Sequence, residues 1–250
     1  MRIKLRYERK YLVPNYFLDA IRKRLSGFVR PDIFTAPDTE GNPQYTVRSI
    51  YFDNSALGCY YEKGDGIMFR RKFRIRSYDS YEPHAKVVFE IKRKIENRIK
   101  KYRAFMCYDD IDDIFDTYDV EKYALKDRRY ETSVDSAKRF FYHYIKYNFY
   151  PTVHVVYERE AYHGKFDPDT RITLDKNIRS RLYPKINDVF SNNNLKYLFK
   201  GHFILEIKYY RDTMPEWAHG IVKEFRLRHD ALSKYTIGID VNKDRVLQIY

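Results

Sequence analysis

The sequence has few of the residues that mark disulfide-rich, zinc-clustered or membrane-spanning proteins. Its only two cysteines, Cys59 and Cys107, are 48 residues apart, and there is no C-x-x-C pair. This spacing predicts two free thiols in a reducing compartment, not a zinc site or a disulfide framework. No stretch approaches the roughly 20 apolar residues that a transmembrane helix needs, and the sequence does not start with a signal segment. We therefore expect a cytoplasmic protein, and a membrane-protein partner stays open.

Several catalytic signatures are also missing. The sequence contains no G-x-G-x-x-G and no G-x-x-x-x-G-K-[ST], which excludes the common nucleotide-binding loops. Its seven histidines lack the H-E-x-x-H spacing, and no serine or cysteine sits in a nucleophile elbow. Covalent catalysis thus has no candidate residue, whereas phosphoryl transfer needs none, because it depends mainly on positioning and charge neutralisation. No linker rich in Gly, Ser or Pro divides the chain, so we expect one domain over residues 1–250.

Aromatic residues and positive charge are abundant. Aromatics make up 18% of the 250 residues, with 26 Tyr against 9 Gly, and the formal net charge is +13. Disordered chains are poor in aromatics, and many tyrosines suit half-buried sheets with polar tips. The chain is long enough to bury a core. The excess of positive charge favours an anionic partner, but it does not choose among nucleic acid, a membrane surface and a phosphate-rich molecule.

Cations alternate along the segment 70–76. Arg70, Lys72, Arg74 and Arg76 are separated by single residues, so in a strand they share one face. An antiparallel sheet often turns one face to water, which is the simpler interpretation. However, like charges on paired strands destabilise a sheet, and similar cationic alternation recurs in several other predicted strands. We therefore favour strand faces that line a groove or tunnel for a polyanion.

The remaining periodicity predicts a mostly antiparallel sheet of about eight strands with helices inserted between them. Amphipathic helices are expected at 14–25, 133–147 and 215–227, where they would cover the apolar faces of the strands. Ser133 is a candidate cap for the second of these helices, and shorter helical segments are expected at 54–66 and 108–119. The expected strands are residues 2–13, 44–52, 67–78, 86–94, 98–106, 151–161, 171–176, 202–210 and 235–240.

Four acids lie on the faces of the predicted strands: Glu8, Glu90, Asp175 and Glu206. Converging carboxylates can hold Mg²⁺ or Mn²⁺, which take oxygen ligands and share them with phosphates. Alternatively, each acid pairs with the lysine two residues along or with an arginine on the neighbouring strand. For Glu8 and Glu90 the two interpretations stay open, whereas for Glu206 we favour the metal.

Eight short segments combine these charged residues with apolar ones in a fixed order along nearly the whole chain. They are ERKY at 8–11, SIYFD at 49–53, RIR at 74–76, FEIK at 89–92, YEREAY at 157–162, RITLD at 171–175, LEIK at 205–208 and SKY at 233–235. This ordered set resembles the VTC domain, the polyphosphate polymerase domain of vacuolar transporter chaperone proteins, in a stand-alone prokaryotic form. That family belongs to the triphosphate tunnel metalloenzymes, which are related to the CYTH domains.

The resemblance implies an α+β fold in which an antiparallel eight-stranded β-barrel forms a tunnel with flanking helices. It implies transfer of the terminal phosphoryl of ATP to a growing polyphosphate chain with Mn²⁺ or Mg²⁺ as cofactor, and ATP and polyphosphate, not a specific nucleic acid, as partners. On this basis we expect catalytic roles for Arg74, Arg76, Lys92 and Lys208, phosphate binding by Lys10, Arg48, Lys72, Arg159, Arg171, Ser233 and Lys234, and metal binding by Glu206, with Glu8 and Glu90 as further candidates.

One position departs from the wider superfamily. CYTH enzymes carry E-x-E-x-K on the first strand, whereas here Arg6 replaces the first Glu in the segment 6–10. The loss of one acidic ligand argues against a two-metal triphosphatase or an adenylate cyclase and favours the polymerase. A tripolyphosphatase or nucleoside triphosphatase on the same tunnel stays an alternative, as does a non-catalytic module that binds polyphosphate or nucleic acid. The acceptor, the preferred metal and the oligomeric state stay open.

Overall fold

The computed structural model describes residues 7–95, 98–210 and 213–243. The first five residues of the first expected strand, residues 2–6, which include Arg2, Lys4 and Arg6, lie outside this range. The strands are β1 (Tyr7–Pro14), β2 (Val29–Pro31), β3 (Ala36–Pro37), β4 (Pro43–Asp53), β5 (Phe69–Tyr78), β6 (Lys86–Ile95), β7 (Arg98–Cys107), β8 (Tyr150–Gly164), β9 (Arg171–Leu182), β10 (Lys196–Tyr197) and β11 (His202–Tyr209).

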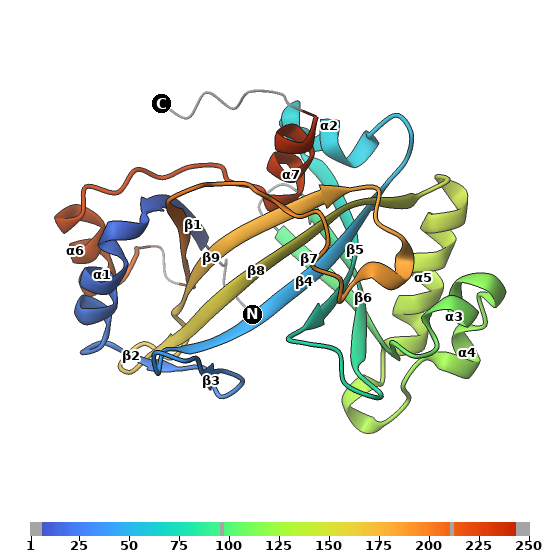
Figure 1. The fold of residues 1–250 in the computed structure, drawn as a ribbon, viewed down its shortest axis with the longest axis horizontal. Coiled ribbons are helices and arrows are strands. Elements are labelled where there is room, and N and C mark those ends of the chain that lie inside the picture. The colour runs from blue at the N-terminus through green and yellow to red at the C-terminus, as the bar shows by residue number, and fades with distance from the viewer. Residues whose placement is uncertain (1–6, 96–97, 211–212, 244–250) are drawn as a thin grey trace. The chain divides into compact units, whose positions relative to one another are not determined.

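Helices connect or follow these strands (Figure 1). Within the described ranges, no helix is long and apolar enough to cross a membrane. The helices are α1 (Leu18–Leu25), α2 (Gly58–Gly64), α3 (Ile111–Thr117), α4 (Val120–Tyr123), α5 (Ser133–Lys146), α6 (Glu216–Glu224) and α7 (Lys234–Asn242), with short 3-10 turns at Asn15–Phe17, Arg128–Tyr130 and Ile186–Asp188.

The main path of the sheet contains eight strands in the order β1-β11-β9-β8-β4-β5-β6-β7, and the short strands β10, β2 and β3 pair with β9, β8 and β4. The pairs β1–β11, β11–β9, β4–β5, β5–β6 and β6–β7 are all antiparallel. This confirms the predicted α+β class with flanking helices. Among the described residues the end strands β1 and β7 are not paired with each other, so the hydrogen-bonded path is open where a closed barrel was expected.

The chain groups into two compact units. The first unit contains residues 1–46, 157–179 and 197–233, and the second contains residues 47–156, 180–196 and 234–250. Strands β4, β8 and β9 contribute residues to both units. We describe each unit by itself, and the expectation of a single functional domain over residues 1–250 stays a prediction.

The core of the first unit lies on one face of β1, β11 and β9. Strand register aligns Tyr11 with Leu205 and Leu205 with Leu174, and alternate residues along each strand add to the same face. Helices α1 and α6, which lie side by side in Figure 1, cover this face with Ile21 and Ile221, which are 0% and 2% exposed. Full burial of such side chains stabilises a fold by about 1.5–3 kcal/mol each.

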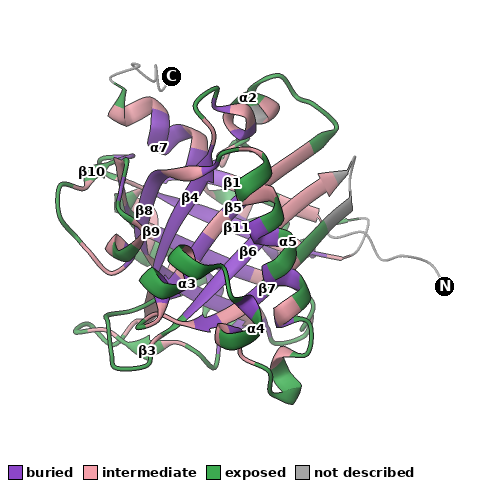
Figure 2. Cartoon of the chain, turned by 90° about the vertical axis from the view of Figure 1, so that its right-hand side faces the viewer, coloured by how far each residue is buried: buried purple, intermediate pink, exposed green. Residues whose placement is uncertain are grey.

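The core of the second unit is formed by β5, β6 and β7 under α5. Phe73 and Phe89 point from the strands to Phe140 of α5, with ring centroids 6.0 and 5.2 Å away. In Figure 2 the outer faces of α3, α4 and α5 are exposed while the strands behind them are buried. The helical segment predicted at 108–119 contains the helix α3, which buries Ile111 and Ile114.

Two local predictions are wrong. The hydroxyl of Ser133 does not cap α5; it accepts a hydrogen bond from Phe105 N at 2.7 Å and donates to Phe105 O at 3.2 Å, so it ties the helix to β7. Residues 235–240 form the helix α7 and not a last strand. Gly238 lies so close to Ser180 that a Cβ atom would come within 3.3 Å of the Ser180 Oγ. Tertiary packing of this kind overrides weak strand propensity.

Candidate functional site

The four cations of β5 lie on one sheet face, as the alternation predicted. Phe73 and Ile75 between them are buried on the opposite face, at 1% and 0% exposure, whereas the cations are half-buried. Register places Lys72 directly opposite Lys92 of β6. Because like charges opposite each other destabilise paired strands, this face favours an anionic ligand. We call it the β5 face; it consists of Arg70, Lys72, Arg74, Arg76, Lys92 and Lys94.

Glu90 is a buried acid between the cations of the β5 face, with 3% of its surface exposed. Arg74 donates to its Oε2 through Nε at 2.7 Å and also through Nη2, and Arg103 Nε donates to its Oε1 at 3.2 Å. Burial alone would raise the pKa of Glu90, but Arg74, Arg76 and Lys101 outweigh it and hold that pKa far below its usual range. Both carboxylate oxygens thus accept hydrogen bonds from cross-strand arginines, which favours the ion-pair interpretation of Glu90; its role as a further metal ligand stays a prediction.

Two hydroxyl groups of β4 also accept hydrogen bonds from the guanidinium groups of Arg74 and Arg76. Tyr51 Oη accepts from Arg74 Nη1 at 3.1 Å, and Ser49 Oγ accepts from Arg76 Nε at 3.1 Å. Burial acts to raise the pKa of Tyr51, but the two arginines outweigh it and lower the pKa. Glu90 on β6 and Tyr51 on β4 therefore fix the orientation of the Arg74 guanidinium. A planar guanidinium in a fixed orientation suits an anion of defined geometry.

Sequence reasoning missed two cations of β7 that lie beside this cluster. Register sets Arg103 opposite Glu90 and Lys101 opposite Lys92. Burial lowers the pKa of Lys101 to about 8, although Glu90 acts in the opposite direction. The sequence does contain this pattern, because Lys101 and Arg103 alternate with Tyr102 and Ala104 in the strand predicted at 98–106.

Arg48 is not part of the β5 face. It pairs with Ser77 of β5. Its side chain lies on the same face of β4 as the buried Ile50, and this face is opposite to the one that carries Ser49 and Tyr51. Only 6% of Arg48 is exposed, its Nε donates to Asp79 O at 2.6 Å, and its Nη1 donates to Asn192 Oδ1 at 2.7 Å. These contacts connect two loops of the second unit, so the predicted phosphate-binding role has no support from the position of Arg48.

Lys234 is the first residue of α7 and belongs to the second unit, whereas the preceding Ser233 is the last residue of the first unit. Tyr235 anchors the start of α7, because its hydroxyl donates to the fully buried carboxylate of Asp53. The Tyr235 ring is 5.6 Å from the ammonium of Lys72. This anchor places the first turn of α7 beside the β5 face.

Charges of opposite sign alternate on the other candidate surface, in the first unit. Register pairs Glu8 with Lys208 and Lys10 with Glu206 across β1 and β11. Lys10 Nζ lies 2.9 Å from Glu8 Oε1 and 3.9 Å from Glu206 Oε2, and Lys208 forms an ion pair with Glu206 Oε1. We call this surface the β11 face; it consists of Glu8, Lys10, Arg171, Thr173, Glu206 and Lys208.

The β11 face has donors that suit a hard divalent cation. Glu206 is 4% exposed, and its neighbour on β9 is Thr173, whose buried Oγ1 has no hydrogen-bond partner in the part of the chain that the structure describes. The ammonium of Lys10 already lies between the carboxylates of Glu8 and Glu206. Two carboxylates and a hydroxyl are an all-oxygen donor set of the kind that Mg²⁺ and Mn²⁺ prefer. The residues present therefore fit such an ion.

The two predicted arginines of β8 and β9 differ in their partners. Arg159 donates to Asp175 Oδ1 at 2.6 Å and to Oδ2 at 2.8 Å, and both side chains are buried. Burial acts to lower the pKa of Arg159, but Asp175 outweighs it and raises that pKa. Arg171 Nη2 donates to Asp32 and Tyr45, whereas its buried Nε has no hydrogen-bond partner among the described residues. Arg171 is thus the better placed of the two to bind an anion.

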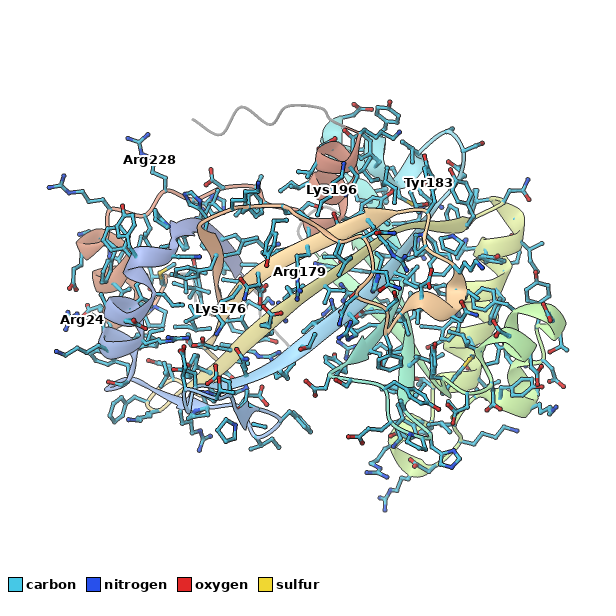
Figure 3. All side chains as sticks on the ribbon, viewed as in Figure 1. Arg24, Lys176, Arg179, Tyr183, Lys196 and Arg228 are labelled. Atoms are coloured by element: carbon cyan, nitrogen blue, oxygen red, sulfur yellow. The ribbon has the colours of Figure 1, made fainter. Side chains whose placement is uncertain are left out.

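Two further cations stand along β9 (Figure 3). Lys176 forms a 2.6 Å ion pair with the buried Glu160, and Arg179 forms a 2.5 Å ion pair with Glu158. These acids already neutralise them, so we do not count them among the candidate phosphate ligands.

Comparison with known proteins agrees with the family predicted from the sequence. A family model of the VTC domain matches residues 5–243. No curated protein matches the sequence. Among solved structures, a putative adenylyl cyclase from Hippeastrum, described as having a dominant triphosphatase activity, is 14% identical with a TM-score of 0.48 and covers 96% of this chain and 97% of its own. The PH1819 protein from Pyrococcus horikoshii OT3 is 13% identical with a TM-score of 0.44 and covers 95% and 99%. Since the family match extends over nearly the whole sequence, the chain belongs to the VTC domain family.

Proposed function

We propose that this protein is a polyphosphate polymerase, which transfers the terminal phosphoryl of ATP to a growing polyphosphate chain with the help of Mn²⁺ or Mg²⁺. The main observation behind this proposal is the β5 face, a row of cations on paired strands in which hydrogen bonds orient Arg74 and Arg76, in a chain of the VTC domain family. A dense row of this kind suits a polymer with a negative charge on every phosphate.

In the second unit, Arg74 and Arg76 are the proposed catalytic arginines. A guanidinium can bind two phosphate oxygens at once, and its charge is not lost at neutral pH. Lys92 is the proposed catalytic lysine of this unit and stands opposite Lys72 on the same face; we assign Lys72 and Lys234 to the binding of phosphate groups. Concentrated positive charge lowers the repulsion between a donor and an acceptor that are both anions, which is a large part of the barrier to phosphoryl transfer.

In the first unit, Lys208 is the proposed catalytic lysine, and Lys10 and Arg171 are the proposed phosphate ligands. Arg159 and Ser233 are also proposed to bind phosphate, although the guanidinium of Arg159 already donates hydrogen bonds to both carboxylate oxygens of Asp175. Glu206, assisted by Glu8 and Thr173, would hold the divalent ion. When bound, that ion would neutralise charge on phosphate oxygens.

The reaction requires no general base from the protein. The acceptor is the terminal phosphate of the chain, and this group already carries a nucleophilic oxyanion. The protein then has to bind the two anionic substrates, align their reacting phosphates and neutralise their charge, and cationic side chains can do all three. Hydrolysis of a triphosphate would use the same ligands with water as acceptor, so the products must decide between the two reactions.

The test is incubation of the purified chain with γ-labelled ATP and Mn²⁺, followed by gel analysis of labelled products. We expect long-chain polymer from the wild type and at least about a hundredfold loss with Arg76→Ala, as is usual when an oriented charge-stabilising donor is removed. Lys100→Ala is the matched control, because Lys100 is an exposed residue of β7 and lies on the face of the strand opposite to Lys101. Labelled orthophosphate without polymer would assign the hydrolase instead, and unchanged polymer synthesis by Arg76→Ala would refute the role of the β5 face.

A further inference from the structure

Three side chains with metal-binding atoms meet at the open end of the β6–β7 hairpin, away from the residues of the β5 face. Cys107 is the last residue of β7, and the N–H of the next residue, Tyr108, donates to Ala85 O at 2.8 Å. The antiparallel ladder therefore continues beyond the end of the strands. As a consequence His84, which precedes β6, lies opposite Asp109, which follows β7.

The donor atoms of His84, Cys107 and Asp109 all lie within 4.8 Å of one another. In a tetrahedral site with ligand bonds of 2.0–2.3 Å, neighbouring ligand atoms are roughly 3.3–3.8 Å apart. His84 Nδ1 is already 3.5 Å from Asp109 Oδ2, and 89% of the His84 side chain is exposed, so it can rotate towards an ion. Small side-chain adjustments are thus enough to complete such a geometry.

Surrounding groups already orient the carboxylate. Asp109 Oδ2 accepts from the backbone N–H of His84 at 2.9 Å, and Asp109 Oδ1 accepts from Tyr81 Oη at 2.9 Å. The rings of Tyr81 and Tyr108 pack against Phe190 with centroid distances of 5.7 and 4.8 Å. Hydrogen bonds to a ligating carboxylate are typical supports of metal sites, because they fix the ligand before the ion arrives.

Contrary to the prediction from cysteine spacing, we propose that His84, Cys107 and Asp109 form a binding site for Zn²⁺ or a similar borderline transition-metal ion, with water at the fourth position. Thiolate and imidazole ligands select zinc or cobalt over magnesium, calcium and manganese, which prefer oxygen. The site is therefore chemically distinct from the all-oxygen donor set around Glu206. A bound ion would join the segment before β6 to the end of β7 and stabilise this end of the hairpin.

The test is titration of the full-length chain, without a polyhistidine tag, with Co²⁺ and then Zn²⁺. We expect one equivalent of Co²⁺ to bind with the visible absorption of a tetrahedral site and the near-ultraviolet absorption of a cobalt–thiolate bond. Zn²⁺ should displace it, and calorimetry should give the affinity for Zn²⁺ directly. Absence of the thiolate absorption at one equivalent of Co²⁺ would overturn the proposal.

Variants identify the ligands. Cys107→Ser should remove the thiolate absorption, and it should weaken Zn²⁺ binding at least about tenfold, since even supporting residues of metal sites contribute that much. His84→Asn should weaken it similarly; asparagine suits this position, because the φ angle of residue 84 is 63° and Asn tolerates positive φ. His219→Asn on the exposed surface of α6 is the matched control and should bind as the wild type does. With circular dichroism showing each variant folded, unchanged affinity in Cys107→Ser or in His84→Asn would contradict the assigned ligands.

Discussion

Arg74 directs two guanidinium nitrogens at one carboxylate oxygen, Oε2 of Glu90, on the neighbouring strand. The same acid also receives Arg103 at its other oxygen. Glu90 is 3% exposed and lies within a face that otherwise carries cations. It therefore acts as the internal counter-ion that lets these strands pair before any anionic ligand binds.

Replacement of Glu90 by alanine should destabilise the protein. Removing one partner of a buried ion pair leaves uncompensated charge, which typically costs about 3–5 kcal/mol. Urea denaturation should show this loss for Glu90→Ala, and addition of tripolyphosphate should restore part of it by supplying negative charge. Glu82→Ala, at an exposed acid just before β6, is the control and should change the free energy of unfolding by less than about 0.5 kcal/mol. Equal stability of both variants would show that Glu90 is not the counter-ion.

The buried hydroxyl of Thr173 gives a test of the metal site that separates binding from stability. Because its Oγ1 is buried without a hydrogen-bond partner among the described residues, Thr173→Val should stabilise the metal-free protein by about 1 kcal/mol. The same variant should need more Mn²⁺ for half-maximal stabilisation against urea. A stability loss in the metal-free state, with no change in Mn²⁺ dependence, would contradict the proposed role.

The buried histidine of β8 should make the fold sensitive to acid. His154 is 0% exposed, and its Nε2 contacts Val189 O at 3.1 Å. Burial first, then Arg181 and Arg48, lower the pKa of His154 from 6.5 to about 3. His154 is thus neutral in the folded state, whereas the unfolded chain binds a proton once the pH falls below 6.5. Stability is therefore fully present above pH 6.5 and is lost as the pH falls towards 3.

The expected contribution of His154 is about 1.4 kcal/mol of lost stability per pH unit within this window. Urea denaturation at a series of pH values measures it as the difference in slope between the wild type and His154→Gln. The exposed His219 is the control, and His219→Gln should keep the wild-type slope. Parallel profiles for the wild type and His154→Gln would mean that the buried imidazole does not limit acid stability.

Two helical glycines offer a matched pair of substitutions. A Cβ at Gly238 of α7 would come within 3.2 Å of Val153 Cγ2, whereas at Gly220 of α6 it would meet nothing within 4 Å. Gly238→Ala should therefore destabilise by about 1–3 kcal/mol through overpacking, and Gly220→Ala should stabilise by about 0.5–1 kcal/mol through helix propensity. Thermal unfolding of both variants checks the contrast, and a stabilised Gly238→Ala would show that α7 packs less tightly than described.

The sequence alone determined which faces of the strands carry charge. Side chains alternate across a strand whatever the rest of the fold does, so the cations from Arg70 to Arg76 had to share a face once that segment became a strand. The same local rule placed Glu206 next to Lys208 on one face of β11. The ordered segments from residue 8 to residue 235 also pointed to the correct family, which the match over residues 5–243 confirms.

Partners across strands were decided by tertiary structure alone. Local sequence does not set the register that brings Arg74 and Arg103 to Glu90, or the hydrogen bonds of Arg48 to Asp79 and Asn192. Residues 235–240 form a helix where local propensity predicted a strand, and Gly238 of that helix packs closely against Ser180. His84 and Asp109 are neighbours only because the β6–β7 ladder brings together residues far apart in the chain. Side-chain alternation is local and can be read directly, whereas pairing and packing depend on which distant segments meet, because that choice is set by burial of the whole core.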